Sequence, residues 1–210
     1  MSNVTTVLLI RHGQSEGNIR EIFTGHSDVP LTELGRRQAA CTADYLADRH
    51  IDAFYASDLK RAMETAEIIA TPHGLPVTPE PRLRELFGGD WEGEDFNLVR
   101  HHPAYAKWHG DLAHAATPNG ESVSELCTRV VAAMQDIAAR HPGQTVCVTA
   151  HATPIRVLET LLSGAPIDAV HWVHNASVTV LAYENGVGRL IERDIHAHQA
   201  EIATSLPEDI

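Results

Sequence analysis

The feature of this sequence that most constrains its fold is an alternation of short apolar segments with longer segments of helical periodicity. Residues 4–10 and 145–149 are short and rich in β-branched and aliphatic side chains, so they are predicted to be buried strands. Residues 52–56 are predicted to form a further short strand. Strands that alternate with helices are typical of an α/β domain with a mainly parallel sheet. We therefore predict a three-layer α/β/α sandwich.

Capping residues indicate where two of the helices begin. Thr32 is expected to cap a helix that runs to about Arg49, and Gly35 is a weak point near its start. Ser57 or Asp58 is expected to cap the next helix, whose apolar residues recur at helical spacing.

Two more helix starts are predicted in the second half of the chain. Ser122 and Glu125 match a capping box, which opens a long helix that runs to Arg140. Thr153 followed by Pro154 is a capping residue followed by proline at the first helical position.

The remaining segments differ in regularity. Residues 177–183 and 188–194 are predicted to form a hairpin around residues 184–186. The segment 79–120 is rich in proline, glycine and tryptophan, and we expect it to be a loop-rich cap over a site. The length fits one domain over residues 1–210 better than two.

The charge balance limits the partners of the protein. The 210 residues include 16 Lys and Arg against 28 Asp and Glu, a formal net charge of −12. An acidic protein repels nucleic acid and anionic membranes at long range, so neither is an expected partner. It also repels a phosphorylated substrate, so a phosphate site must gather positive charge locally.

The cysteines and the apolar runs point to a cytoplasmic protein. The chain has three cysteines, an odd number, and no pair has CxxC spacing: Cys41, Cys127 and Cys147. We therefore expect reduced and mostly buried thiols. The run from Val7 to Ile10 is too short for a signal-peptide core, and no stretch reaches the ~18 apolar residues of a membrane span. The sequence shows no cluster of metal ligands, so no metal is expected.

Histidines end two of the predicted strands. His12 follows the first strand and His151 follows the strand at 145–149. In open α/β sheets, ligands bind outside the carboxyl ends of the strands. Neutral histidine is a good nucleophile near neutral pH, and an arginine such as Arg11 binds phosphoryl oxygens in a bidentate way. By itself, Arg11-His12-Gly13 is only suggestive, because a single histidine at a strand end is more often a structural, hydrogen-bonded residue.

Two further residues supply the other parts of a phosphoryl site. Arg61 lies in the first turn of its predicted helix, where backbone N–H groups also favour anions. Glu85 lies near aromatic residues, where a carboxyl group can have a raised pKa and act as an acid. Taken alone, Glu85 is better explained as a solvated loop carboxylate.

The motifs together, in chain order, resemble the signature of the histidine phosphatase superfamily, also called the phosphoglycerate mutase-like family. The resemblance covers roughly residues 4 to 180 and rests on six segments: Arg11-His12-Gly13-Gln14-Ser15-Glu16-Gly17-Asn18, Thr24 to Thr32, Ser57 to Ala66, Leu83-Arg84-Glu85 with Trp91-Glu92-Gly93, Pro118 to Ser122, and His151 with Ile155-Arg156. It implies the phosphoglycerate mutase-like fold and a phosphatase active without metal or other cofactor.

The resemblance also implies roles for individual residues. His12 would be the nucleophile that becomes phosphohistidine, and Glu85 would protonate the leaving oxygen and then activate water. Arg11, Arg61 and His151 would surround the phosphoryl group. The predicted substrate-binding residues are Gln14, Asn18, Thr24, Gly25, Ser57 and Ala152, of which Ala152 stands where glycine is common in the family.

Two alternatives to a phosphatase stay open. A cofactor-dependent phosphoglycerate mutase would use the same His12, but mutases of the family carry a longer, more basic insertion, and residues 94–120 hold only Arg100 and Lys107 as basic residues besides histidine. A catalytically dead phospholigand-binding protein would usually have lost the nucleophile or an arginine. The substrate is expected to be a small phosphorylated metabolite, whose identity the sequence does not assign. A homodimer through an edge strand is expected only by analogy with the fold.

Overall fold

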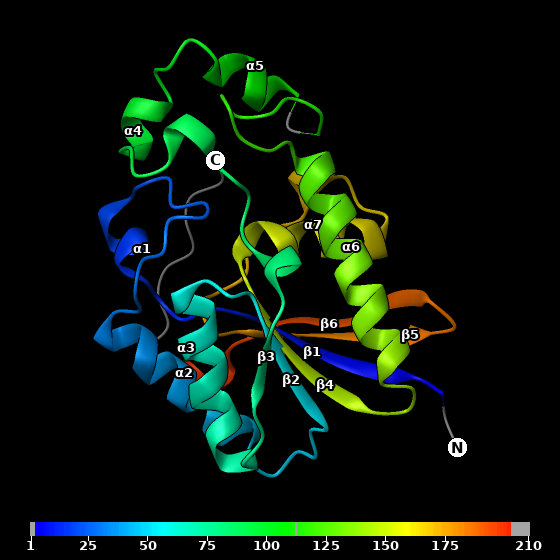
Figure 1. Ribbon diagram of the computed structural model, residues 1–210. Helices are drawn as coiled ribbons and strands as arrows, with labels where there is room; N and C mark the ends of the chain where they lie inside the picture. Colours follow the sequence, from blue (N-terminus) through cyan, green and yellow to red (C-terminus); the bar gives the residue numbers. More distant parts are fainter. Residues whose placement is uncertain (1–2, 112, 203–210) are drawn as a thin grey trace.

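A central six-stranded sheet organises the computed structural model, which describes residues 3–111 and 113–202 (Figure 1). The strand order is β3-β2-β4-β1-β5-β6. β4 pairs in parallel with β1 and β2, and β2 with β3, whereas β5 runs antiparallel to both β1 and β6. The strands are β1 (Thr5–Arg11), β2 (Ala53–Ala56), β3 (Val77–Pro79), β4 (Thr145–Ala150), β5 (Val178–Glu184) and β6 (Val187–Ile195).

Helices cover both faces of the sheet because the strands are apolar on both sides. Val7 and Leu9 of β1 pack with the cluster that includes α6 (Val123–Arg140) and α7 (Ala152–Ser163). Leu8 and Ile10 point the other way, toward the cluster that includes α2 (Glu33–Leu46) and α3 (Lys60–Ala70). Successive side chains of a strand face opposite sides of the sheet, so the predicted three-layer α/β/α sandwich is confirmed (Figure 1).

Short helices complete the described elements. Most of them lie in the segment after β3 or near the C-terminal hairpin. They are α1 (Glu16–Arg20), η1 (Thr71–His73), η2 (Pro81–Leu83), η3 (Gly89–Trp91), α4 (Phe96–Val99), α5 (Tyr105–Gly110), η4 (Ile167–Ala169) and η5 (Ala197–Gln199).

Two of the predicted helix caps are confirmed. The Thr32 hydroxyl accepts the N–H of Gly35 at 3.0 Å, although α2 already ends at Leu46. The Ser122 hydroxyl accepts the N–H of Glu125, whose carboxylate in turn accepts the N–H of Ser122, which completes the capping box of α6.

The other two predicted caps are wrong. α3 has Leu59 at its N-cap, because Ser57 hydrogen-bonds to His151 and Asp58 pairs with Arg84. α7 begins directly after β4, with His151 rather than Thr153 at the N-cap. At the start of α3, the side chains of Ser57 and Asp58 are engaged by other residues and so do not cap the helix. At the start of α7, the helix begins before Thr153 is reached.

Gly35 is a point of close backbone approach rather than a weak point of its helix. A Cβ atom on Gly35 would lie 2.0 Å from the carbonyl oxygen of Gln14, and one on Gly13 would lie 2.3 Å from the carbonyl oxygen of Gly35. The two glycines therefore let the start of α2 pack directly against the loop that follows β1.

The C-terminal hairpin forms as predicted. β5 and β6 are joined at Asn185 and Gly186, which have φ values of 52° and 78°. Positive φ at both central residues is what a two-residue turn between twisted strands requires.

Aromatic side chains fill the segment between β3 and α6. The rings of Trp91 and Trp108 meet edge to face at 5.4 Å, and Phe23 from the loop after α1 contacts both. Trp91 and Trp108 are buried, so much of the aromatic content here packs the segment itself.

The cysteines and the helices show two further properties. Cys41, Cys127 and Cys147 are all free; Cys147 is buried and the other two are half-buried. Among the described residues, no helix is both long and apolar enough to cross a bilayer.

Candidate active site

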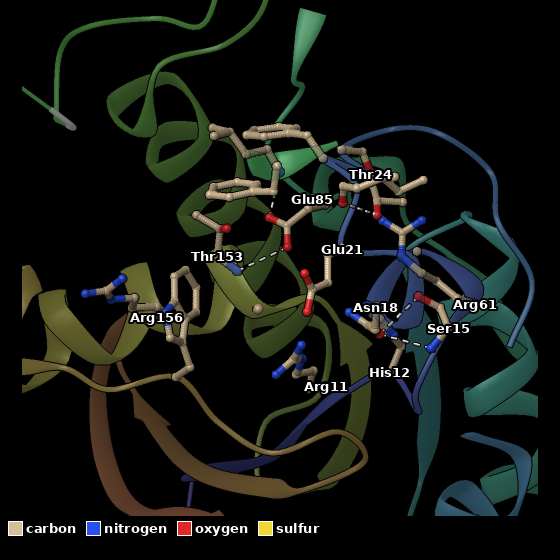
Figure 2. Close-up of a pocket in the computed structure, with 18 of the residues that line it drawn as sticks. Arg11, His12, Ser15, Asn18, Glu21, Thr24, Arg61, Glu85, Thr153 and Arg156 are labelled. Carbon is tan, nitrogen blue, oxygen red and sulfur yellow. Dashed lines mark hydrogen bonds between the residues drawn. The ribbon is translucent and has the colours of Figure 1, made fainter. Parts of the chain in front are cut away.

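A pocket of about 920 Å³ lies where β1 and β4 end. It contains nine of the residues that the sequence analysis selected: Arg11, His12, Gln14, Asn18, Thr24, Gly25, Arg61, Glu85 and Ala152. Figure 2 shows several of them converging from β1, α3 and the loop around Glu85. Ser57 and His151 are fully buried and do not line this pocket.

The His12 ring is held in one tautomer. Its Nδ1 lies 2.7 Å from the carbonyl oxygen of Gly13. A carbonyl only accepts hydrogen bonds, so Nδ1 carries the proton and Nε2 keeps its lone pair. Burial, followed by the charges of Arg61 and Arg11, holds the pKa of His12 well below its usual value. The ring is therefore neutral at neutral pH, which a nitrogen nucleophile requires.

Arg11 and Arg61 bring two buried guanidinium groups to the pocket. Arg11 Nη1 donates to the carbonyl oxygen of Val173 at 2.6 Å. Arg61 donates to the carbonyl oxygens of Gly25 and Ser27, each at 2.8 Å. Burial lowers the pKa of both arginines to about 10, against the attraction of Glu85, which raises it. Both arginines therefore stay charged at neutral pH and supply the local positive charge that the acidic chain needs.

His151 and Ser57 form a buried pair next to His12. The rings of His12 and His151 are 5.1 Å apart, and His151 Nε2 lies 2.8 Å from the Ser57 hydroxyl. Burial and the charge of Arg61 hold the pKa of His151 well below its usual value. The Nδ1 atom of His151 is buried and has no hydrogen-bond partner among the described residues.

Glu85 is fixed by backbone hydrogen bonds at both carboxylate oxygens. Oε1 accepts the N–H of Leu86 at 2.7 Å, and Oε2 accepts the N–H of Thr153, in the first turn of α7, at 3.2 Å. Its main-chain oxygen accepts from Arg129 of α6 at 2.7 Å. Arg129 also donates to the carbonyl oxygens of Arg82 and Arg84, so one side chain fixes the course of the loop that carries Glu85.

Residues from the segment between β1 and α2, which includes α1, also line the pocket. Asn18 Oδ1 accepts from both the N–H and the hydroxyl of Ser15, so its amide nitrogen is the group left to donate into the pocket. Gln14 Oε1 accepts from Thr32 at 2.8 Å. Gly25 has φ 47° and its carbonyl oxygen binds Arg61, so this loop positions the arginine as well as the pocket wall.

Glu92 joins the two loops that flank the pocket, and the sequence analysis gave it no role. Its Oε1 accepts the N–H of His26 at 2.6 Å and the N–H of Gly88 at 3.0 Å, and its Oε2 accepts from the Ser27 hydroxyl. Glu92 therefore ties the loop that carries Gly25 to the loop that follows Glu85.

The outer part of the pocket contains residues for which the sequence predicted no role, although Arg156 belongs to one of the family motifs. Arg156 stacks its guanidinium over the Trp172 ring at 4.4 Å, and Phe23, Glu21 and Asn175 also line the pocket. Trp172 and Asn175 come from the loop before β5. No periodicity or short motif marks them, because only the folded chain brings this loop beside β1.

The comparison with protein families agrees with this geometry. The model of the histidine phosphatase superfamily (branch 1) matches residues 7–195. The chain belongs to this superfamily. The expected family and its phosphoglycerate mutase-like fold are thus confirmed.

Other members of the superfamily resemble the chain along most of its length. Phosphoserine phosphatase 1 of Hydrogenobacter thermophilus is 30% identical over 200 residues, which are 93% of this chain and 94% of that protein. The solved structure of Bacillus stearothermophilus YhfR has a TM-score of 0.86 and 31% identity, covering 92% of this chain and 98% of the other. A phosphoglycerate mutase from Bacillus anthracis has a TM-score of 0.84 and 27% identity, covering 96% and 97% of the two chains. The superfamily includes phosphatases, so the expectation of a phosphatase-type enzyme is confirmed at the level of the family.

Proposed function

We propose that this member of the superfamily hydrolyses phosphate monoesters without a metal, through a phosphohistidine formed on Nε2 of His12. The observation that carries the proposal is the hydrogen bond from His12 Nδ1 to the Gly13 carbonyl oxygen. It leaves a lone pair on Nε2 in a pocket where two buried arginines can hold the oxygens of a phosphoryl group.

The reaction then has two steps. In the first, the Nε2 lone pair attacks phosphorus, the ester P–O bond breaks, and Glu85 gives a proton to the leaving oxygen. In the second, water attacks the phosphohistidine while the Glu85 carboxylate takes its proton. The P–N bond breaks, and the electron pair returns to Nε2 of His12.

The remaining residues hold the phosphoryl group in this account. Arg11 and Arg61 neutralise its charge, and His151 donates to one of its oxygens while the Ser57 hydroxyl orients the His151 ring. The amide nitrogen of Asn18 and the loop residues Gln14, Thr24, Gly25 and Ala152 complete the predicted binding surface. Charged groups that are already in place around the reacting phosphoryl group give a large electrostatic stabilisation of the transition state.

The substrate is proposed to be a small phosphorylated metabolite. Beyond His12, the pocket continues to an aromatic wall of Phe23, Phe96 and Trp108 and to the Arg156–Trp172 stack. This mixture suits an organic group that is partly apolar and carries polar or acidic substituents. We propose that the segment 79–120 covers the site as part of one domain.

The proposal is tested by p-nitrophenyl phosphate hydrolysis in the presence of a chelator, with the wild type beside His12→Ala. We expect chelator-resistant turnover in the wild type and none above background in His12→Ala, with thermal melts confirming that both are folded. Hydrolysis that survives loss of His12 would refute the assignment. A parallel assay on 3-phosphoglycerate with and without bisphosphoglycerate separates hydrolysis from mutase activity.

Location and assembly are also proposals. The three free thiols suit a reducing compartment, and we propose a cytoplasmic protein. For the homodimer, β6 offers an edge strand with exposed Val187 and Ile191. Sedimentation velocity on the wild type and on a Val187→Lys, Ile191→Lys variant tests it, since a dimer through this edge is lost in the variant.

A further inference from the structure

Three side chains from the C-terminal part of the chain converge outside the pocket. His174 lies in the loop before β5, Asp194 lies near the end of β6, and His196 follows that strand. One donor atom of each lies within 4.8 Å of the other two, and within the described residues they form the one group of this kind. No short metal-ligand spacing marks this group in the sequence, because 20 residues separate His174 from Asp194.

The distances suit shared coordination of one ion. Asp194 Oδ2 lies 2.7 Å from His174 Nδ1 and 3.4 Å from His196 Nδ1. Two ligands of a tetrahedral Zn²⁺, each about 2.1 Å from the ion, are about 3.4 Å apart. The two imidazole rings are stacked with their centroids 3.8 Å apart. His196 Nδ1 also lies 2.6 Å from the main-chain oxygen of Asp194, a hydrogen bond that it must give up to bind the ion. An outward movement of the His174 ring by roughly 0.7 Å would bring its Nδ1 to this spacing from Asp194 Oδ2.

The carboxylate is held by the surrounding residues as a metal ligand usually is. Asp194 Oδ1 accepts the N–H of His174 at 2.7 Å, which leaves Oδ2 to face the rings. The N–H of Asp194 lies 3.3 Å from the Thr179 hydroxyl, which itself binds Glu159. Hydrogen bonds of this kind orient ligating carboxylates.

The backbone at Asp194 departs from a regular strand. Asp194 has φ 51°, in the left-handed region that few residues other than glycine adopt. The β5–β6 register shifts just before it, around Val180. A bulge and a left-handed residue together re-aim a side chain, and here they direct Asp194 toward the two histidines.

We propose that His174, Asp194 and His196 bind a divalent transition-metal ion of the Zn²⁺ class. Two imidazoles and one carboxylate favour such ions over Mg²⁺ and Ca²⁺, which prefer oxygen ligands. Water completes the coordination, since all three side chains retain some exposure to solvent. On binding, the proton on each Nδ1 moves through solvent to Nε2, so that a neutral ring offers its Nδ1 lone pair to the ion.

The ion would fasten the loop before β5 to the end of β6. This loop also contacts the candidate nucleophile, because Val173 accepts from Arg11 and Asn175 donates to the carbonyl oxygen of His12 at 3.0 Å. The three ligands do not line the pocket, so the ion acts on the stability of this region and takes no part in the phosphoryl transfer.

The test is calorimetric titration of chelator-treated, dialysed protein with Zn²⁺. We expect one equivalent to bind to the wild type and that equivalent to be lost in His196→Gln and in Asp194→Asn. His50→Gln is the matched control, because it removes an exposed imidazole that pairs with the carboxylate of Asp52 far from this group in the sequence. At free Zn²⁺ about 100-fold above Kd, the wild-type Tm should rise by about 5–10 °C.

Each alternative result counts against the proposal. Absence of binding to the wild type, or one equivalent that persists in both ligand variants, overturns it. In the second case, inhibition of p-nitrophenyl phosphate hydrolysis at the same Zn²⁺ concentration would assign the ion to the catalytic histidines. His196 is the most exposed of the three ligands, and Asn tolerates the left-handed backbone at position 194, so both variants should fold without metal. A metal-free melt confirms this.

Discussion

At the scale of single residues, the site depends on groups whose partners are mostly backbone atoms. Arg61 shows this most clearly: it is 1% exposed and its two terminal nitrogens bind the carbonyl oxygens of Gly25 and Ser27. The planar guanidinium can hold both carbonyls and still present N–H groups to a phosphoryl oxygen, whereas an ammonium group cannot match this geometry.

We therefore expect Arg61→Lys to lower kcat/KM for p-nitrophenyl phosphate by at least about 100-fold, in the range found when one transition-state donor is removed. Circular dichroism and a thermal melt show whether the variant is folded. A folded variant with activity within a few-fold of the wild type would show that charge alone suffices at this position.

The polar residues at the centre of the pocket could be predicted from the sequence, whereas those at its outer edge could not. His12, Arg61 and Glu85 could be predicted because each belongs to a short motif with recognisable chemistry. Trp172 and Asn175 were not, since the loop that carries them reaches the site only through the pairing of β5 with β1.

At the scale of elements, the loop that carries Glu85 is positioned by α6. Arg129 donates to three carbonyl oxygens of that loop, those of Arg82, Arg84 and Glu85. Nothing in the spacing of the α6 residues distinguishes Arg129 from Arg140, so only the folded structure reveals its role.

Arg129→Met should lower kcat by about 10-fold or more with little change in KM, because Glu85 loses its alignment while Arg11 and Arg61, the proposed phosphate-binding arginines, stay in place. Steady-state kinetics on p-nitrophenyl phosphate measures both constants. Arg140→Met, at the exposed end of the same helix, is the control and should match the wild type. A change confined to KM would mean that Arg129 acts on binding instead.

The contact between the loop after β1 and the start of α2 makes a second prediction at this scale. A Cβ on Gly13 would meet the Gly35 carbonyl oxygen at 2.3 Å, and backbone cannot move aside without shifting the neighbouring His12. Gly13→Ala should therefore destabilise the protein by about 1–3 kcal/mol and lower its activity.

Gly110→Ala provides the matched comparison for Gly13→Ala. Gly110 lies in α5 with open space around its Cβ position, so alanine there should be neutral or slightly stabilising. Urea unfolding of both variants measures the difference. Equal stability of the two variants would show that the close approach of Gly13 and Gly35 relaxes easily.

The order of elements was largely predictable, because apolar strands and capping boxes leave local signals. The helix starts at α3 and α7 were not, because Ser57 and Thr153 resemble capping residues. In the folded protein, the Ser57 hydroxyl is used by His151, and the Thr153 N–H donates to Glu85.

At the scale of the whole molecule, burying histidines beside arginines has a cost at acidic pH. The pKa values of His12 and His151 are held well below their usual value, mainly by burial. Between the folded and unfolded pKa values, the unfolded chain binds more protons than the native protein, so the free energy of unfolding falls as the pH falls below about 6.5. Above that pH, both rings are neutral in either state and the penalty disappears.

Each of the two histidines should thus contribute a slope of up to about 1.4 kcal/mol per pH unit between its two pKa values. Urea unfolding between pH 7.5 and 5 tests this on the wild type and on His151→Gln, which should lose less stability over the same range. Parallel curves for the two proteins would show that His151 binds its proton as readily when folded as when unfolded.

The central claim is that His12 Nε2 carries the phosphoryl group during turnover, and it is tested most directly by identifying the phosphorylated atom. The protein is mixed rapidly with p-nitrophenyl phosphate, quenched in base, where phosphohistidine survives, and mapped by peptide mass spectrometry. We predict an acid-labile phosphoryl group on the peptide that contains His12 and none in His12→Ala. An active wild-type protein that hydrolyses the ester while its phosphoryl group appears on another residue, or on none under any quench, would contradict the account.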